Sequence, residues 1–134
     1  MKRREIRESA FKLTFESLFR DDSADEIIAL AEDVEEITVN DDVIKLFKGT
    51  LEKSEELNMI IEKYSEKRAL DRIPKVNIAV LKLALYEILY DEKVPLNVAI
   101  NEAVLISKKY SQEADVNFVN GVLGAYSRAE GEKE

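Results

Sequence analysis

The sequence contains no cysteine and no histidine. Without these side chains the chain has no thiol nucleophile, no disulfide, no zinc site of the Cys/His type and no imidazole general base. Glycine and proline are also scarce, with four and two residues among 134, so the strongest helix breakers are nearly absent. Hydrophobic residues make up 46% and charged residues 36%, which is typical of a soluble helical protein. These absences exclude much enzyme chemistry and favour helices.

Long apolar runs are missing as well. None approaches the roughly 20 residues that a helix needs to span a bilayer, and the start lacks the apolar block of a secretory signal. Acidic residues at Glu5, Glu8 and Glu16 disfavour a transit peptide. We therefore expect a cytoplasmic protein with no membrane partner, in which residues 1–129 form one helical domain and residues 130–134 a disordered tail.

Positive charge is distributed unevenly along the chain. The whole protein carries a net charge of -8, yet residues 1–20 hold six cations and three acids, which leaves -11 on the other 114 residues. An acidic chain repels nucleic acid, so any polyanion would have to be contacted locally, within about a Debye length of the basic segment. The cations of this segment are Lys2, Arg3, Arg4, Arg7, Lys12 and Arg20.

The basic segment opens a predicted helix over residues 3–20. Cations at a helix start are unfavourable by a few tenths of a kcal/mol each, because the macrodipole is positive there. A solvated helix start is the simple interpretation, but a phosphate chain would compensate this cost through the free N–H groups and the arginine side chains. The charge pattern alone therefore leaves both interpretations open.

Three phenylalanines follow the cations at helical spacing. Phe11, Phe15 and Phe19 recur every four residues along the margin of the apolar face. We expect Phe11 to lie in the core and Phe19 to pack against the fold. Phe15 is placed so that it offers a stacking surface for an unpaired base, beside the arginines of the preceding turns.

The rest of the chain also shows helical periodicity, with no convincing strand pattern. Ser23 and Glu26 form a capping box before a short helix. Six or so helices with short connections predict an all-α bundle, because short loops make successive helices antiparallel. Further helices are expected over 26–34, from Asn40 or Asp41 to about Tyr64, from Pro74 through the most apolar segment, over 96–110 and over 115–129.

Several polar residues and glycines in the C-terminal half have structural interpretations. The pairs Tyr86-Glu87 and Asn101-Glu102 lack a second acid or metal ligand at helical spacing, so we expect buried or half-buried hydrogen-bonding roles rather than catalysis. Gly121 and the nearby Gly124 lie inside the last predicted helix, where each costs about 1 kcal/mol. Close approach of another backbone would explain them. We identify no catalytic residue, metal site or cofactor site.

Four phrases occur in a fixed order, and together they resemble the NusB family. They are "RREIRESAFKLTF" (3–15), "VLKLALYEIL" (80–89), "VPLNVAINEAVLISKKY" (94–110) and "NFVNGVL" (117–123). The resemblance implies an all-α, compact bundle of six to seven helices in two three-helix sub-bundles, without enzymatic activity. It implies a transcription antitermination factor that binds boxA single-stranded RNA together with the ribosomal protein NusE. The RNA polymerase antitermination complex is then a further partner.

The resemblance also implies positions for RNA contact. The family's arginine-rich motif corresponds to the start of the first helix, and Phe15 stands where relatives have an aromatic residue. Phe118 is equally compatible with a core position. The RNA-binding residues expected from charge and resemblance together are Lys2, Arg3, Arg4, Arg7, Phe15, Asn117 and Phe118.

Three residues depart from the family pattern. Glu5 lies within the basic motif, Arg68 stands where many relatives have Trp, and Asp115 where Ser is frequent. These departures predict weaker RNA contact by the isolated chain, or contact shared with the partner. The alternative function is a purely protein-binding helical scaffold, or a homodimer, with no direct RNA contact.

Overall fold

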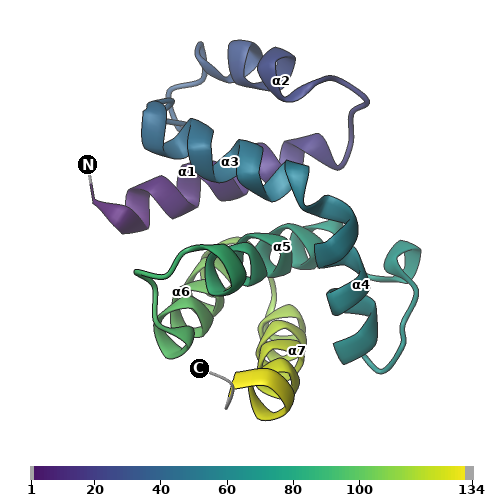
Figure 1. Ribbon diagram of the computed structural model, residues 1–134. Coiled ribbons are helices and arrows are strands. Elements are labelled where there is room, and N and C mark those ends of the chain that lie inside the picture. Colours follow the sequence, from purple (N-terminus) through teal and green to yellow (C-terminus); the bar gives the residue numbers. More distant parts are fainter. Residues whose placement is uncertain (1, 132–134) are drawn as a thin grey trace.

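The computed structural model describes residues 2–131, which form seven α-helices and one short 3-10 turn and contain no strand (Figure 1). The all-α prediction is confirmed. The expected tail begins at Glu130, which is the last residue of α7, and residues 132–134 lie outside the described residues. The elements are α1 (Arg3–Ser17), α2 (Ala24–Ala31), α3 (Asp41–Glu52), α4 (Ser54–Tyr64), the turn η1 (Leu70–Arg72), α5 (Lys75–Tyr90), α6 (Leu96–Tyr110) and α7 (Glu113–Glu130).

The predicted long third helix is broken at Lys53. This residue has φ -96° and ψ 13°, which ends α3 and lets α4 start in a new direction. Phe47 of α3 belongs to a small core with α1 and α2, whereas Leu57 and Ile61 of α4 belong to the larger core of the molecule. The break changes the direction of the chain, so that Phe47 packs in the smaller core and Leu57 in the larger one.

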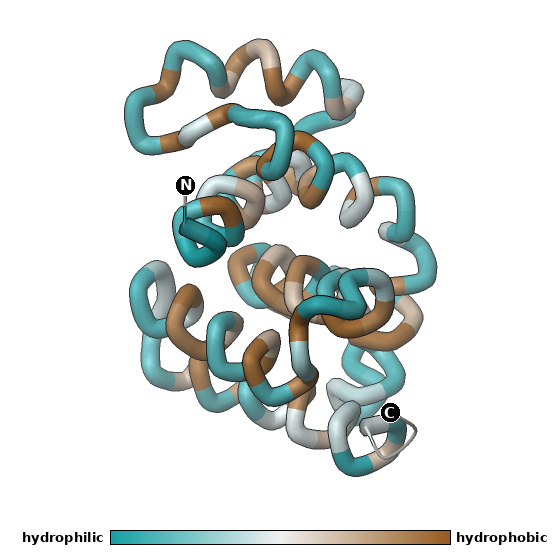
Figure 2. The backbone as a smooth tube through the Cα atoms, turned by 60° about the vertical axis from the view of Figure 1, so that its left-hand side comes forward, coloured by the Kyte–Doolittle hydropathy of each residue, from teal (hydrophilic) through white to brown (hydrophobic). Residues whose placement is uncertain are grey.

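The helices therefore divide into two groups around these cores. The first group is α1, α2 and α3, and the second holds four helices, α4 to α7, because the second half of the predicted third helix joins it. Helix α1 contributes to both cores, with Phe11 in the larger core and Leu13 in the smaller one. Figure 2 shows hydrophobic residues recurring along the helices, while most of the connections are hydrophilic.

Helix α5 lies in the middle of the fold, between α1 on one side and α6 and α7 on the other (Figure 1). Most of its residues are buried, as the apolar segment predicts, and Pro74 is the N-cap residue rather than the first helical residue. Three polar side chains are buried on this helix, those of Asn77, Lys82 and Glu87. Since buried polar groups need partners, α5 fixes the positions of polar groups on its neighbours.

Glycines in the helices differ in their surroundings. Apart from the adjacent residues and the nearby backbone of α7 itself, no atom lies within 4 Å of the place that a Cβ would take at Gly121, and only the Arg128 side chain lies near that place at Gly124. The expected close backbone approach at α7 is therefore wrong. A Cβ at Gly49 of α3 would instead overlap the ring of Tyr86 on α5.

Alanine substitutions at these glycines should have opposite effects. Gly121→Ala is expected to raise the free energy of unfolding by about 1 kcal/mol, because alanine favours the helix. Gly49→Ala gains the same propensity but must displace the Tyr86 ring, and overpacking costs about 1–3 kcal/mol. We expect G49A to be about 2 kcal/mol less stable than G121A in urea denaturation. Equal stabilisation of both variants would contradict this packing.

Candidate nucleic-acid interface

The predicted basic cluster lies at the start of α1, but its four cations differ in exposure. Lys2 is the exposed N-cap residue, and the side chains of Arg3 and Arg4 are 55% and 67% exposed. Arg7 is buried, with a relative exposure of 6%. Glu5 is exposed in the same turn. Only three of the four predicted cations can therefore meet a polyanion at the surface.

Acidic residues of α5, α6 and their connection hold the three arginines. Arg3 donates from Nη2 to Asp91 Oδ2 at 2.9 Å. Arg4 donates to both carboxylate oxygens of Glu102, from Nε at 3.0 Å and from Nη2 at 2.9 Å. These acids provide the compensation that cations at a positive helix start require. The basic cluster is thus already partly neutralised within the chain.

Beneath this surface lies a buried ion pair. Arg7 Nε donates to both oxygens of Glu87, at 2.9 and 3.1 Å, and Arg7 Nη1 lies 3.6 Å from Glu102 Oε1. Burial raises the pKa of the Glu87 carboxyl above its ordinary value, although the hydrogen bond from Arg7 opposes this effect. The pKa of the Glu102 carboxyl shifts in the other direction: the hydrogen bonds from Arg4 lower it below its ordinary value.

The structural interpretation of the two acidic pairs is mostly confirmed. Glu87 and Glu102 are buried and hydrogen-bonded, and Tyr86 is half-buried. Asn101 is exposed, so the expectation of burial is wrong for this residue. On α6 the side chain that faces α1 is Glu102, and its neighbour in sequence necessarily points elsewhere because helical residues one apart lie about 100° apart.

The three phenylalanines of α1 extend the surface away from the cations. Phe11 is buried, as predicted, with its ring centroid 5.3 Å from that of Tyr110. Phe15 is half-buried and borders an apolar groove of about 480 Å³ between α1 and α2. Phe19 packs against Phe15, as expected, with ring centroids 5.0 Å apart, but it does so at the surface, where it is 59% exposed. Helix α1 ends at Ser17, which leaves Phe19 on the following turn.

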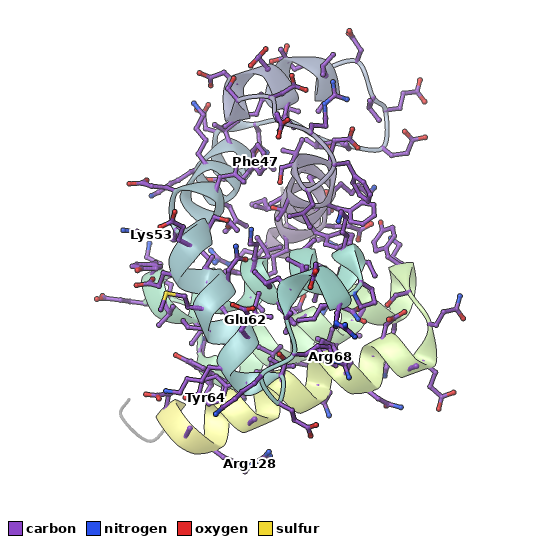
Figure 3. The ribbon with its side chains drawn as sticks, turned by 90° about the vertical axis from the view of Figure 1, so that its right-hand side faces the viewer. Phe47, Lys53, Glu62, Tyr64, Arg68 and Arg128 are labelled. Carbon is purple, nitrogen blue, oxygen red and sulfur yellow. The ribbon has the colours of Figure 1, made fainter. Side chains whose placement is uncertain are left out.

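The start of α7 carries the other two predicted residues. Asn117 is exposed and Phe118 is half-buried. The guanidinium carbon of Arg68 lies 5.0 Å from the centroid of the Phe118 ring, which is a cation–π contact. Figure 3 labels Arg68 on the connection that follows α4. Arg68 therefore adds a cation where many relatives were expected to have an aromatic residue.

Contacts with α5 link these features of α1 to those at the start of α7. Arg3 lies beside Asp91 just beyond the end of α5, while Lys75 at the beginning of α5 lies over the Phe19 ring, 5.7 Å from its centroid. The antiparallel α5 thus follows α1 along its length. Asn77 of α5 donates a hydrogen bond to Asp115 of α7 at 3.0 Å, and this contact connects the start of α7 to α5.

We call this surface the basic aromatic strip. Four of its cations were given no RNA-binding role from the sequence, namely Lys12, Arg68, Lys75 and Lys109. Their contacts with aromatic rings join residues that are distant in sequence or that were assigned no role. Lys12 and Lys109 both lie over the Tyr110 ring, at 5.7 and 5.5 Å. The strip comprises Lys2, Arg3, Arg4, Lys12, Phe15, Phe19, Arg68, Lys75, Lys109, Tyr110, Asn117 and Phe118.

Within residues 2–131, no group of three or more Asp and Glu side chains is arranged to hold a metal ion. No helix of the described part of the chain is long and apolar enough to cross a membrane.

Comparisons with known proteins agree with the resemblance. The model of the NusB family matches residues 4–128. A transcription antitermination protein NusB from Acetivibrio thermocellus is 40% identical over 126 residues, which cover 92% of this chain and 87% of the relative. A protein of the same name from Natranaerobius thermophilus is 39% identical, with 92% of each chain covered.

Solved structures share the fold over nearly the whole chain. The structure of T. maritima NusB has a TM-score of 0.82 and 35% identity, covering 99% of this chain and 96% of that one. A chain in the crystal structure of antitermination factors NusB and NusE in complex with dsRNA has a TM-score of 0.79 and 27% identity. The match covers 95% of this chain and 96% of that one.

Proposed function

Because this chain belongs to the NusB family of non-enzymatic transcription antitermination factors, we propose that it binds boxA single-stranded RNA together with NusE and promotes readthrough by RNA polymerase. One observation carries the proposal. Three exposed cations of an acidic protein lie together at the start of α1, and further cations and aromatic rings continue from them along the basic aromatic strip. A strip of cations and aromatic rings matches both chemical parts of a single strand, its phosphates and its unstacked bases.

In this proposal, phosphates contact the start of α1. Lys2, Arg3 and Arg4 are exposed there, and the first N–H groups of a helix are also anion donors. Phosphate contacts set the position of the RNA, while contacts with base edges and faces distinguish its sequence. Phe15 and Phe118 are half-buried rings on the strip. Because the Arg68 guanidinium already lies over the Phe118 ring, Phe15 is the ring on which we propose that a splayed base stacks.

The proposed protein partner is NusE. A structural neighbour of this chain was solved with NusE and RNA. Outside residues 1–20 this chain carries a net charge of -11, which favours association with a basic ribosomal protein. In this proposal the RNA binds the basic aromatic strip. The proposed place of action is the cytoplasm, in the antitermination complex of RNA polymerase.

Titration of a boxA-like single-stranded RNA tests this function. The RNA is titrated with the protein alone and with the protein and NusE together, and a scrambled RNA of equal length serves as the control. We expect weak binding by the protein alone and tighter, sequence-dependent binding with NusE. Equal affinity for both RNAs in the presence of NusE would count against a boxA function.

Phe15→Leu tests the stacking part of the proposal. Stacking of a base on an aromatic ring is worth about 1–3 kcal/mol in proteins that bind single strands, so we expect about a ten-fold loss of RNA affinity. Leucine keeps much of the apolar contact with the fold, which limits the effect on stability. Tyr90→Leu is the matched control, because Tyr90 is an exposed ring outside the strip. Equal losses for F15L and Y90L would remove Phe15 from the site.

The groove beside Phe15 favours the alternative, a protein-binding scaffold or homodimer. It is mostly apolar, and Leu30 and Val34 of the α2 region are exposed beside it. Gel filtration with light scattering distinguishes a monomer from a homodimer. A stable homodimer that fails to bind RNA in the presence of NusE would favour this alternative.

A further inference from the structure

The contact between Arg4 and Glu102 has an unusual position. The side chain of Arg4 is 67% exposed, whereas that of Glu102 is only 10% exposed and lies beneath it on α6. Both oxygens of the carboxylate accept hydrogen bonds from one edge of the guanidinium, formed by Nε and Nη2. A cation at the surface is therefore held from below by an acid of the same chain.

A phosphate can use the same edge. Arginine binds carboxylate and phosphate in the same bidentate way, with two parallel N–H donors. An RNA phosphate that binds Arg4 through Nε and Nη2 therefore competes with Glu102 for the same donors. RNA binding then replaces the Glu102 carboxylate by a phosphate at Arg4. The net gain in binding free energy is therefore smaller than it would be for an arginine with no partner.

We propose that Glu102 sets the RNA affinity of this protein by occupying Arg4 in the free state and yielding it to a phosphate when RNA binds. The inference rests on the proposed RNA-binding function. It assigns Glu102 a role beyond helix packing, that of an internal competitor of the RNA backbone.

The neighbouring acid Glu87 does not have this role. Its partner Arg7 is buried and cannot reach a phosphate at the surface without unfolding the start of α1. Glu87 therefore fixes α1 on α5. Glu102 can release Arg4 more easily, because Arg7 Nη1 lies 3.6 Å from its Oε1 and stays there as a cationic neighbour. The exchange thus leaves no isolated buried charge, which would be costly.

Glu102→Gln in the full chain tests the exchange. We expect the variant to bind boxA-like RNA about five- to ten-fold more tightly than the wild type, both alone and with NusE. The control is Glu55→Gln on α4, an exposed residue that changes the net charge equally, and its affinity should change less than two-fold. Glu102→Asp keeps the charge but shortens the side chain, so we expect a smaller gain in RNA affinity. This variant also allows the test to be made if E102Q folds poorly.

A double-mutant cycle locates the effect on Arg4. In an Arg4→Gln background, Glu102→Gln should no longer change the affinity, because the competitor has lost its target. A gain that persists in this background overturns the exchange, and so does unchanged or weaker binding by folded E102Q and E102D. If the wild type binds RNA but E102Q does not bind more tightly, only the exchange is wrong. If no variant binds RNA with or without NusE, the proposed function fails with it.

Discussion

Replacing Arg7 by methionine is expected to lower the free energy of unfolding by about 3–5 kcal/mol, the usual effect of removing one partner of a buried ion pair. The substitution leaves the Glu87 carboxylate without the Arg7 Nε donor in a position where only 3% of its side chain is exposed. Urea denaturation followed by circular dichroism measures the loss. The expected effect is large because the remaining charge is desolvated and not because the pair itself is strongly stabilising.

A second substitution checks this explanation. Arg7→Met combined with Glu87→Met should recover most of the lost stability, because apolar replacements of a whole buried pair are often neutral or stabilising. Arg3→Gln should lose less than about 1 kcal/mol, since its pair with Asp91 is largely exposed. An R7M protein as stable as the wild type would contradict the buried pair.

The position of Arg7 changes the interpretation of the basic start. Sequence and resemblance place it among the RNA-binding residues, but its guanidinium is occupied by Glu87 and lies near Glu102. A loss of RNA binding on substitution of Arg7 would therefore follow from unfolding of the start of α1. We expect the phosphate contacts to come from Lys2, Arg3 and Arg4.

Substitution of Arg3 and Arg4 by glutamine should reduce the affinity for boxA-like RNA about 30-fold. Hydrogen bonds to charged groups are worth about 1.5 kcal/mol or more each, and competition from Glu102 offsets part of this contribution at Arg4, so the two contacts together account for about 2 kcal/mol. Glutamine avoids the repulsion that glutamate would introduce beside Asp91 and Glu102. The affinity of R3Q/R4Q is measured by RNA titration in the presence of NusE.

The control for net charge removes two cations elsewhere. Lys48 on α3 and Lys63 on α4 are exposed and lie outside the strip, so K48Q/K63Q has the same net charge as R3Q/R4Q. Its RNA affinity should fall less than about three-fold, through long-range electrostatics alone. Similar losses for both double variants would mean that RNA responds to overall charge and not to the start of α1. Melting temperatures of all variants show whether the fold is intact.

The fold was largely predictable because helical periodicity is a local property. Residues 96–110 form a helix with the predicted bounds, and the capping box of Ser23 and Glu26 is present before α2. The break at Lys53 was missed, because the apolar pattern continues across it. Only the three-dimensional arrangement shows that Phe47 and Leu57 belong to different cores.

The sequence predicted which residue types make up the candidate site, but not which acids pair with its arginines. The charge asymmetry indicates the start of α1, and spacing indicates Phe15 beside it. The acids that hold the arginines come from positions 80 or more residues away, and no local pattern joins Arg4 to Glu102. The same holds for Arg68 over Phe118 and Lys75 over Phe19, which are contacts between separate elements.

The salt dependence of RNA binding tests the central claim most directly. Each phosphate contact with a single strand contributes about -0.7 to the slope of log K against log salt concentration. With NusE present, the wild type should show a clear negative slope, and R3Q/R4Q should show a slope shallower by about 1.4. Equal slopes for the two proteins, or a flat response of the wild type, would contradict phosphate contact at the start of α1.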